Sequence, residues 1–95
     1  MKKYEAMFIV KPDLSEEEKK TLFNQISEAV TKFSGEVSQG AVWSEKRKLF
    51  FPIRRNREGI YYLLNFTAET KSITDINHAY KLNEGILRVL ITRLE

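Results

Sequence analysis

Residues 4–33, which read YEAMFIVKPDLSEEEKKTLFNQISEAVTKF, decide the fold because their hydrophobic period changes partway along. The first seven alternate apolar side chains between two faces, which predicts a β-strand that ends before Pro12. Ser15 and Glu18 then have the spacing of a capping box, which predicts the start of a helix. Apolar residues follow at helical spacing, at Leu22, Phe23, Ile26, Val30 and Phe33. The stretch therefore predicts a strand and an amphipathic helix, and Gly35 is the expected helix stop.

Working outward, the rest of the sequence predicts three further strands and a second helix. The expected elements are a long bent strand over residues 37–53, a turn over 56–59, a strand over 60–67, a helix over 72–82 and a strand over 86–94. The order β-α-β-β-α-β is typical of an α+β fold, the ferredoxin-like split β-α-β sandwich. We expect a single domain over residues 1–95, with a four-stranded antiparallel sheet and both helices on one face.

Alternation along the expected strands divides their side chains between two faces of the sheet. The expected core face carries Phe8, Val10, Ile60, Tyr62, Leu64, Phe66, Val89 and Ile91. The opposite, open face carries Met7, Ile9, Tyr61, Leu63, Arg88 and Leu90. The open face is more apolar than solvation requires, so it is either a partner site or a face of ordinary exposed apolar residues.

Positive charge is concentrated in one short segment. Residues 43–60 hold six Lys/Arg and two Glu, a balance of +4, whereas residues 1–42 balance at −1 and residues 61–95 at zero. Such a local field suits phosphate backbones or acidic lipid headgroups, and a solvated hairpin that resists aggregation is the alternative. Within it, the run from Lys46 to Arg57 interleaves cations with aromatic and aliphatic residues. Arginine forks pair with phosphate, and we expect the apolar residues to anchor the hairpin to the body.

Several kinds of chemistry lack the residues they need. The chain has no cysteine, and its single histidine, His78, has no neighbour that would complete a metal or catalytic site. Its four glycines stand alone, so there is no phosphate-binding loop. Residues 6–10 are too short an apolar run for a signal peptide or a membrane span. We expect a non-enzymatic cytosolic protein with no cofactor, no metal, no small-molecule substrate and no membrane partner.

Two short stretches are similar to other RNA- or nucleotide-binding families. Residues 7–13 look like the opening of nucleoside diphosphate kinases, but His78 lacks the surroundings of their phosphate-accepting histidine. Residues 57–62 faintly resemble the aromatic strand of RNA-recognition motifs, with spacing that does not fit that motif. Stacking of single-stranded RNA on the sheet remains an alternative.

Taken together, three motifs make the chain resemble the bacterial small-subunit ribosomal protein S-six family. They are the opening residues 3–13, the basic run KRKLFFPI over 46–53, and the helix-to-strand passage YKLNEGILRV over 80–89. In the second motif, Phe50 and Phe51 replace the family's usual Ala and Tyr, and Trp43 sits one residue further upstream than usual. The resemblance covers residues 2 to about 93 and implies the same ferredoxin-like fold.

The resemblance also implies binding to the central domain of small-subunit ribosomal RNA, as a heterodimer with ribosomal protein S-eighteen. The RNA contacts that it implies are Lys2, Lys3, Tyr4, Lys46, Arg47, Lys48 and Arg88. Charge alone adds Arg54, Arg55, Arg57 and Arg93. The expected partner-binding residues are Trp43, Glu45, Arg47, Leu49, Tyr61 and Leu63. The competing interpretation is a stand-alone ferredoxin-like domain for protein interaction or ligand sensing, which would not bind RNA.

Overall fold

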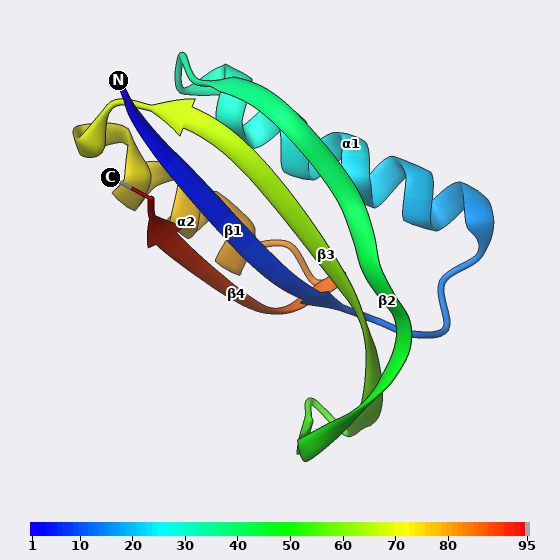
Figure 1. Ribbon diagram of the computed structural model, residues 1–95. Coiled ribbons are helices and arrows are strands. Elements are labelled where there is room, and N and C mark those ends of the chain that lie inside the picture. The colour runs from blue at the N-terminus through cyan, green and yellow to red at the C-terminus, as the bar shows by residue number, and fades with distance from the viewer. Residues whose placement is uncertain (95) are drawn as a thin grey trace.

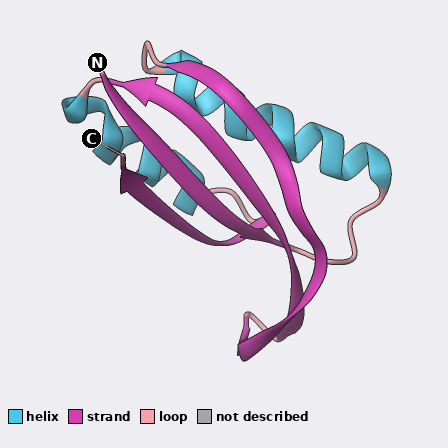
Figure 2. Ribbon diagram, viewed as in Figure 1, coloured by secondary structure: helices cyan, strands magenta, loops and turns pink. Residues whose placement is uncertain are grey.

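The computed structural model describes residues 1–94 and has the predicted element order. The elements are β1 (Lys2–Val10), α1 (Glu16–Lys32), β2 (Glu36–Ile53), β3 (Asn56–Ala68), η1 (Thr70–Ser72), α2 (Ile73–Lys81) and β4 (Ile86–Arg93). Both α-helices cover one face of the sheet and leave the other open (Figures 1 and 2). The predicted ferredoxin-like βαββαβ sandwich is confirmed.

The sheet has the strand order β2-β3-β1-β4, and each neighbouring pair is antiparallel. β1 lies in the middle and pairs with β3 without interruption, from Lys2 opposite Ala68 to Val10 opposite Ile60. β2 is an edge strand, and its pairing with β3 shifts register at several points between Val37 and Ile53. Such irregularities bend and twist a strand, which agrees with the bent strand that the sequence predicted.

Helix α1 begins as predicted, and the left-handed residue that follows its C-terminus lies one position before the expected stop at Gly35. The Ser15 amide donates to Glu18 Oε1 at 2.9 Å and the Glu18 amide donates to Ser15 Oγ at 3.1 Å, so the capping box is confirmed. At the other end, the left-handed residue is Ser34, with φ 66°, and not Gly35. The Gly35 amide donates to the Val30 carbonyl oxygen at 2.9 Å. A side chain at Gly35 would meet the Thr67 carbonyl oxygen, so close approach to β3 explains this glycine.

The core lies between the sheet and the helices, and every residue of the predicted core face contributes to it. Six of the eight are buried, and Val89 and Ile91 on the edge strand β4 are partly buried against them. Tyr80 of α2 packs edge-on against Phe8 at 4.8 Å between ring centroids, and its hydroxyl donates to the Ile26 carbonyl oxygen at 2.7 Å. Burial raises the pKa of the Tyr80 hydroxyl well above its ordinary value.

The turn between β2 and β3 spans residues 53–56, three residues earlier than the sequence predicted. Arg54 and Arg55 form it with φ values of 48° and 69°, and Ile53 pairs directly with Asn56. The Asn56 side-chain amide donates to the Ile53 carbonyl oxygen at 3.3 Å and to the Arg54 carbonyl oxygen at 3.2 Å. The prediction at 56–59 was wrong because it relied on Asn and Gly as turn residues. In the fold, Asn56 braces a turn whose left-handed positions are both arginine.

Candidate nucleic-acid and partner interface

Residues 46–59 form an arm in which β2 and β3 pair with each other beyond the reach of β1. Their pairing continues through Arg47 opposite Gly59 and Lys48 opposite Glu58, whereas β1 ends opposite Ile60. Figure 1 shows this arm curving away below the sheet. In Figure 1 the helices lie over the rest of the sheet and not over the arm, and most side chains of the arm are exposed and available for contacts outside the molecule.

Two aromatic rings of the arm are exposed, although we expected them to pack against the rest of the sheet. Phe50 is 98% exposed and Phe51 is 78% exposed, and their ring centroids lie 6.3 Å apart. The expectation that these residues anchor the hairpin was wrong, because the arm extends past the layer that would have covered them. Leu49 and Ile53 are only partly exposed and fill that role instead. Adjacent bare rings of this size are typical of residues buried by a partner.

A groove of about 610 Å³ lies between the arm and the open face of the sheet. It is lined by Met7, Ile9, Trp43, Arg47, Lys48, Leu49, Phe50, Phe51, Ile53, Tyr61 and Arg88. Within it, the Arg47 guanidinium lies 5.0 Å from the Trp43 ring and 5.8 Å from the Tyr61 ring. The two rings meet edge-on at 5.7 Å. This packing holds Arg47 by cation–π contact at the surface of the groove.

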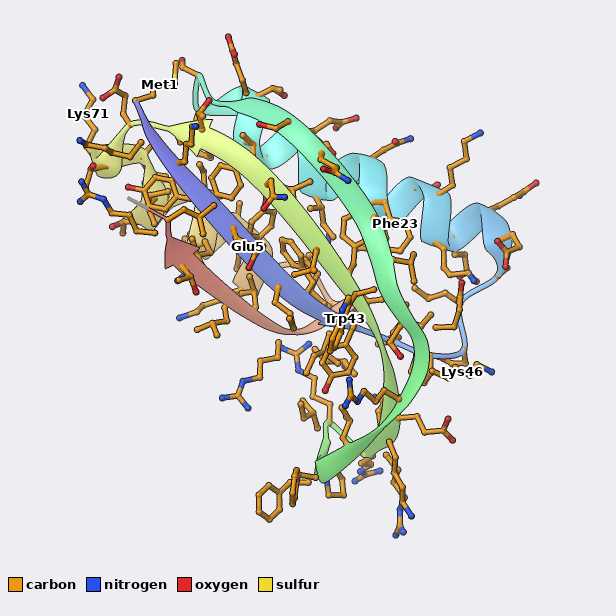
Figure 3. All side chains as sticks on the ribbon, viewed as in Figure 1. Met1, Glu5, Phe23, Trp43, Lys46 and Lys71 are labelled. Atoms are coloured by element: carbon orange, nitrogen blue, oxygen red, sulfur yellow. The ribbon has the colours of Figure 1, made fainter. Side chains whose placement is uncertain are left out.

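The predicted partner residues divide between the two sides of the sheet. Trp43, Arg47, Leu49 and Tyr61 line the groove, and Leu63 is partly exposed on the same open face. Glu45 was expected beside them, but its carboxylate lies 3.8 Å from the Lys19 ammonium of α1. Regular alternation would put Glu45 on the same face as Trp43, but the pairing of β2 with β3 shifts register between Ser44 and Arg47, and this irregularity turns Glu45 away from the groove. Figure 3 shows Lys46 likewise on the other side of β2 from Trp43.

The predicted RNA contacts form two groups at opposite ends of the sheet. Lys46, Arg47, Lys48, Arg54, Arg55 and Arg57 lie on the arm, and Arg88 lines the groove beside it. Lys2, Lys3 and Arg93 lie at the other end, where Tyr4 of β1 pairs with Arg93 of β4. The strand rise of about 3.3 Å per residue puts the groups roughly 20 Å apart. A single phosphate therefore cannot bridge them, although a folded RNA can.

Tyr4 does not belong with either group. Its side chain is only 4% exposed, its ring stacks on Phe66 at 5.7 Å, and its hydroxyl donates to Thr70 Oγ1 at 3.4 Å. A nucleotide cannot reach the ring without displacing it from the core. The expectation of an RNA contact at Tyr4 is corrected on this ground.

Neither a metal-ligand cluster nor a candidate membrane-spanning helix is found among the described residues. Residues 1–94 contain no cluster of three or more His, Asp or Glu side chains arranged to hold a metal ion. Neither α-helix in this range is long and apolar enough to cross a membrane. What the described surface does present is an arm with cations and bare aromatic rings.

Comparison with known proteins places this geometry in a family. The family model described as Ribosomal protein S6 matches residues 3–93. The small ribosomal subunit protein bS6 of Thermoanaerobacter pseudethanolicus is 39% identical over 95 residues, which are 100% of this chain and 99% of the relative. The bS6 protein of Dictyoglomus turgidum is also 39% identical over 95 residues, covering 100% of this chain and 97% of the relative.

A solved structure supports the same fold. The crystal structure of 30S ribosomal protein S6 from Thermotoga maritima superposes with a TM-score of 0.86 at 24% identity, covering 97% of this chain and 86% of that one. At 24% identity, this structural similarity shows the fold only. The family is shown by the family model and by the full-length relatives. On that evidence, the chain belongs to the ribosomal protein S6 family.

Proposed function

We propose that this protein binds the central domain of small-subunit ribosomal RNA cooperatively, as a heterodimer with ribosomal protein S-eighteen. The observation that carries the proposal is the arm, which combines six cations with the exposed rings of Phe50 and Phe51. Family membership makes the chain a non-enzymatic protein of the small ribosomal subunit. The finer statement, which names the RNA region and the partner, is our inference from the arm, the groove and the family resemblance.

The partner half of the proposal is supported by the groove and the exposed rings. Trp43 is 52% exposed and Leu90 is 65% exposed on the open face, in addition to the bare rings of the arm. Clustered apolar side chains of this size lose contact with water when a protein partner covers them, which stabilises the complex. A protein partner therefore suits the groove, and Trp43 together with the arm rings would contribute most of its binding energy.

The RNA half of the proposal is supported by the distribution of charge. The arm carries six Lys/Arg and one Glu between residues 46 and 59, although the whole chain has a net charge of only +3. A protein that neutralises few phosphates binds RNA weakly, and its affinity falls as salt rises. A second basic protein held in the groove would add its own phosphate contacts and preorganise one surface. We therefore expect tight RNA binding from the pair and weak binding from this chain alone.

A filter-binding titration of a central-domain fragment tests the proposal, with and without ribosomal protein S-eighteen and at two salt concentrations. We expect tight, salt-dependent binding only when both proteins are present. Equal affinity for this chain alone and for the pair would contradict cooperativity. No RNA binding under any condition would favour a stand-alone protein-interaction domain instead.

Charge reversal at Arg54, Arg55 and Arg57 sharpens the same experiment, since all three are exposed arm residues. We expect RNA affinity to fall and its salt dependence to flatten. The matched control reverses Lys20, Lys32 and Lys71, which are exposed on or beside the helices and make the same change in net charge. Equal losses from the two triple variants would mean that net charge matters and the arm does not.

A further inference from the structure

Three cations that are far apart in the sequence line one hollow between the turn of the arm and the rest of the molecule. Arg54 comes from the turn, Lys81 is the last residue of α2, and Arg88 lies on β4. They line one hollow of about 310 Å³, whose remaining lining residues are Tyr80, Ile86, Leu87 and Val89. No carboxylate of residues 1–94 lines this hollow. Figure 1 shows the turn of the arm below the start of β4.

A neighbouring hollow provides a contrast. It has a volume of about 360 Å³, and it is lined by Arg54 together with Lys11, Asp13, Asn56 and Glu84. Its two carboxylates offset its two cations, so it does not favour an anion over water. Arg54 lines both hollows, but in the first one the other described lining residues are two further cations and four uncharged residues, which favours a small anion.

The backbone of the turn gives independent support for a role of Arg54. Both Arg54 and Arg55 have positive φ, 48° and 69°, in a two-residue turn where Asn, Asp and Gly are preferred. Left-handed backbone is strained for a residue with a Cβ, and such strain gathers at functional sites. The Asn56 side-chain amide donates to the Arg54 carbonyl oxygen at 3.2 Å and helps to hold this conformation. Asn-Gly would suit such a turn better, so the turn itself does not require arginine at these two positions.

We propose that Arg54, Lys81 and Arg88 form a phosphate-binding site that takes one phosphodiester group of RNA between the arm and the body. The planar guanidinium groups of Arg54 and Arg88 can each donate two hydrogen bonds to phosphate oxygens, and the Lys81 ammonium adds a compact charge. The use of this site on ribosomal RNA rests on the proposed function. An occupied site would also join the arm to α2 and β4, and so orient Phe50 and Phe51.

The first test uses inorganic phosphate on the free protein, so that it does not depend on RNA binding. Phosphate is titrated at constant ionic strength against chloride while NMR follows the amide and side-chain signals. We expect saturable shifts at Arg54, Lys81 and Arg88 that disappear in Arg54→Gln and in Lys81→Gln. The control Lys20→Gln removes an exposed cation of α1 and should bind phosphate as the parent does. Shifts that are absent, or that do not saturate, overturn the site.

The second test uses the ribosomal RNA fragment and the partner protein. We expect Arg54→Gln and Lys81→Gln each to weaken RNA binding roughly tenfold, since each removes a hydrogen bond to a charged group. If both residues hold the same phosphate, the double variant loses less than the product of the two single losses. Equal affinity for these variants and Lys20→Gln overturns the inference while the proposed function stands. If the parent protein itself fails to bind RNA, the proposed function fails and the phosphate titration alone decides the site.

A third variant separates strain from binding. Replacing the turn by Arg54→Asn with Arg55→Gly relieves the left-handed positions, so the thermal midpoint should rise. RNA affinity should fall in the same variant because the Arg54 guanidinium is gone. A more stable protein with unchanged RNA affinity would show that the strained arginine has no role in binding, and would overturn the proposal.

Discussion

Phenylalanine side chains are buried in the body of the sheet, which is the part outside residues 46–59, and exposed on the arm. Phe8, in the middle of the body, is fully buried against Tyr80 and Tyr62, whereas Phe50 on the arm is 98% exposed. Two helices cover one face of the body, whereas most of the arm's side chains are exposed. The difference teaches that the body is stabilised by burial, while side chains of the arm are free to serve binding.

The largest expected effect tests the body side of this comparison. Phe8→Ala should lower the free energy of unfolding by about 3–5 kcal/mol, because it removes a fully buried ring and leaves a cavity. That is a large part of the roughly 5–15 kcal/mol typical of a domain. Urea denaturation measures the change, and Phe50→Ala is the matched control, expected to stay within about 0.5 kcal/mol. Similar losses from both variants would break the comparison.

The next effect tests the arm side. Phe50→Ser with Phe51→Ser should weaken binding to ribosomal protein S-eighteen by roughly 30-fold, the factor expected when interface hot spots are truncated. The stability of the free protein should stay nearly constant, since neither ring packs on the core. Calorimetric titration measures the affinity and urea denaturation checks the fold. Unchanged affinity would mean that the exposed rings do not face the partner.

A smaller effect concerns the hydrogen bond that joins α2 to α1. Tyr80→Phe leaves the ring in place but removes the hydroxyl that donates to the Ile26 carbonyl oxygen. We expect a loss of about 1 kcal/mol in urea denaturation at neutral pH, the usual net value of such a bond. Tyr61→Phe, on the open face, is the control and should leave the free energy of unfolding nearly unchanged. If the Tyr61 variant lost more, the body would not be the more sensitive region.

The same hydroxyl predicts a pH dependence. Because burial raises the pKa of Tyr80 in the folded state, the unfolded chain releases this proton at lower pH than the folded chain. Its contribution is therefore fully present below a pH of about 10, the ordinary tyrosine value, and is lost as pH rises further. Urea denaturation at alkaline pH should show a shallower fall of stability in Tyr80→Phe than in the parent. Parallel pH profiles would contradict this assignment.

The smallest expected effect lies at the exposed start of α1. Two hydrogen bonds from Ser15 lower the pKa of the Glu18 carboxyl. The larger effect comes from the backbone amide of Ser15 and the smaller from its side chain. Its stabilising contribution is present above the unfolded pKa and is lost as pH falls through the folded one. Glu18→Gln should therefore flatten the acid limb of the stability profile slightly, and Glu17→Gln, outside the capping box, should not. Equal pH profiles for the two variants would mean that the capping box does not contribute to stability at acidic pH.

Most of the fold could be predicted because its signals are local. The change of hydrophobic period between residues 4 and 33, the capping box at Ser15 and the predicted core face all follow from spacing along the chain. The candidate site could be predicted only as a charge excess in residues 43–60 and as a family resemblance. Tyr4 was assigned to an RNA contact that its burial does not allow, and Glu45 was expected beside Trp43 but lies next to Lys19 of α1.

The sequence by itself thus determined the order of the elements, the two faces of the sheet and the family, because periodicity, capping and motif order are properties of neighbouring residues. Only the tertiary structure decided which cations meet and which aromatic rings remain bare. Arg54, Lys81 and Arg88 converge because an irregular strand pair carries the turn back toward α2 and β4. Phe50 is exposed because β1 ends opposite Ile60, before the arm begins. Burial depends on which layers continue past a residue, and that is set by the whole fold.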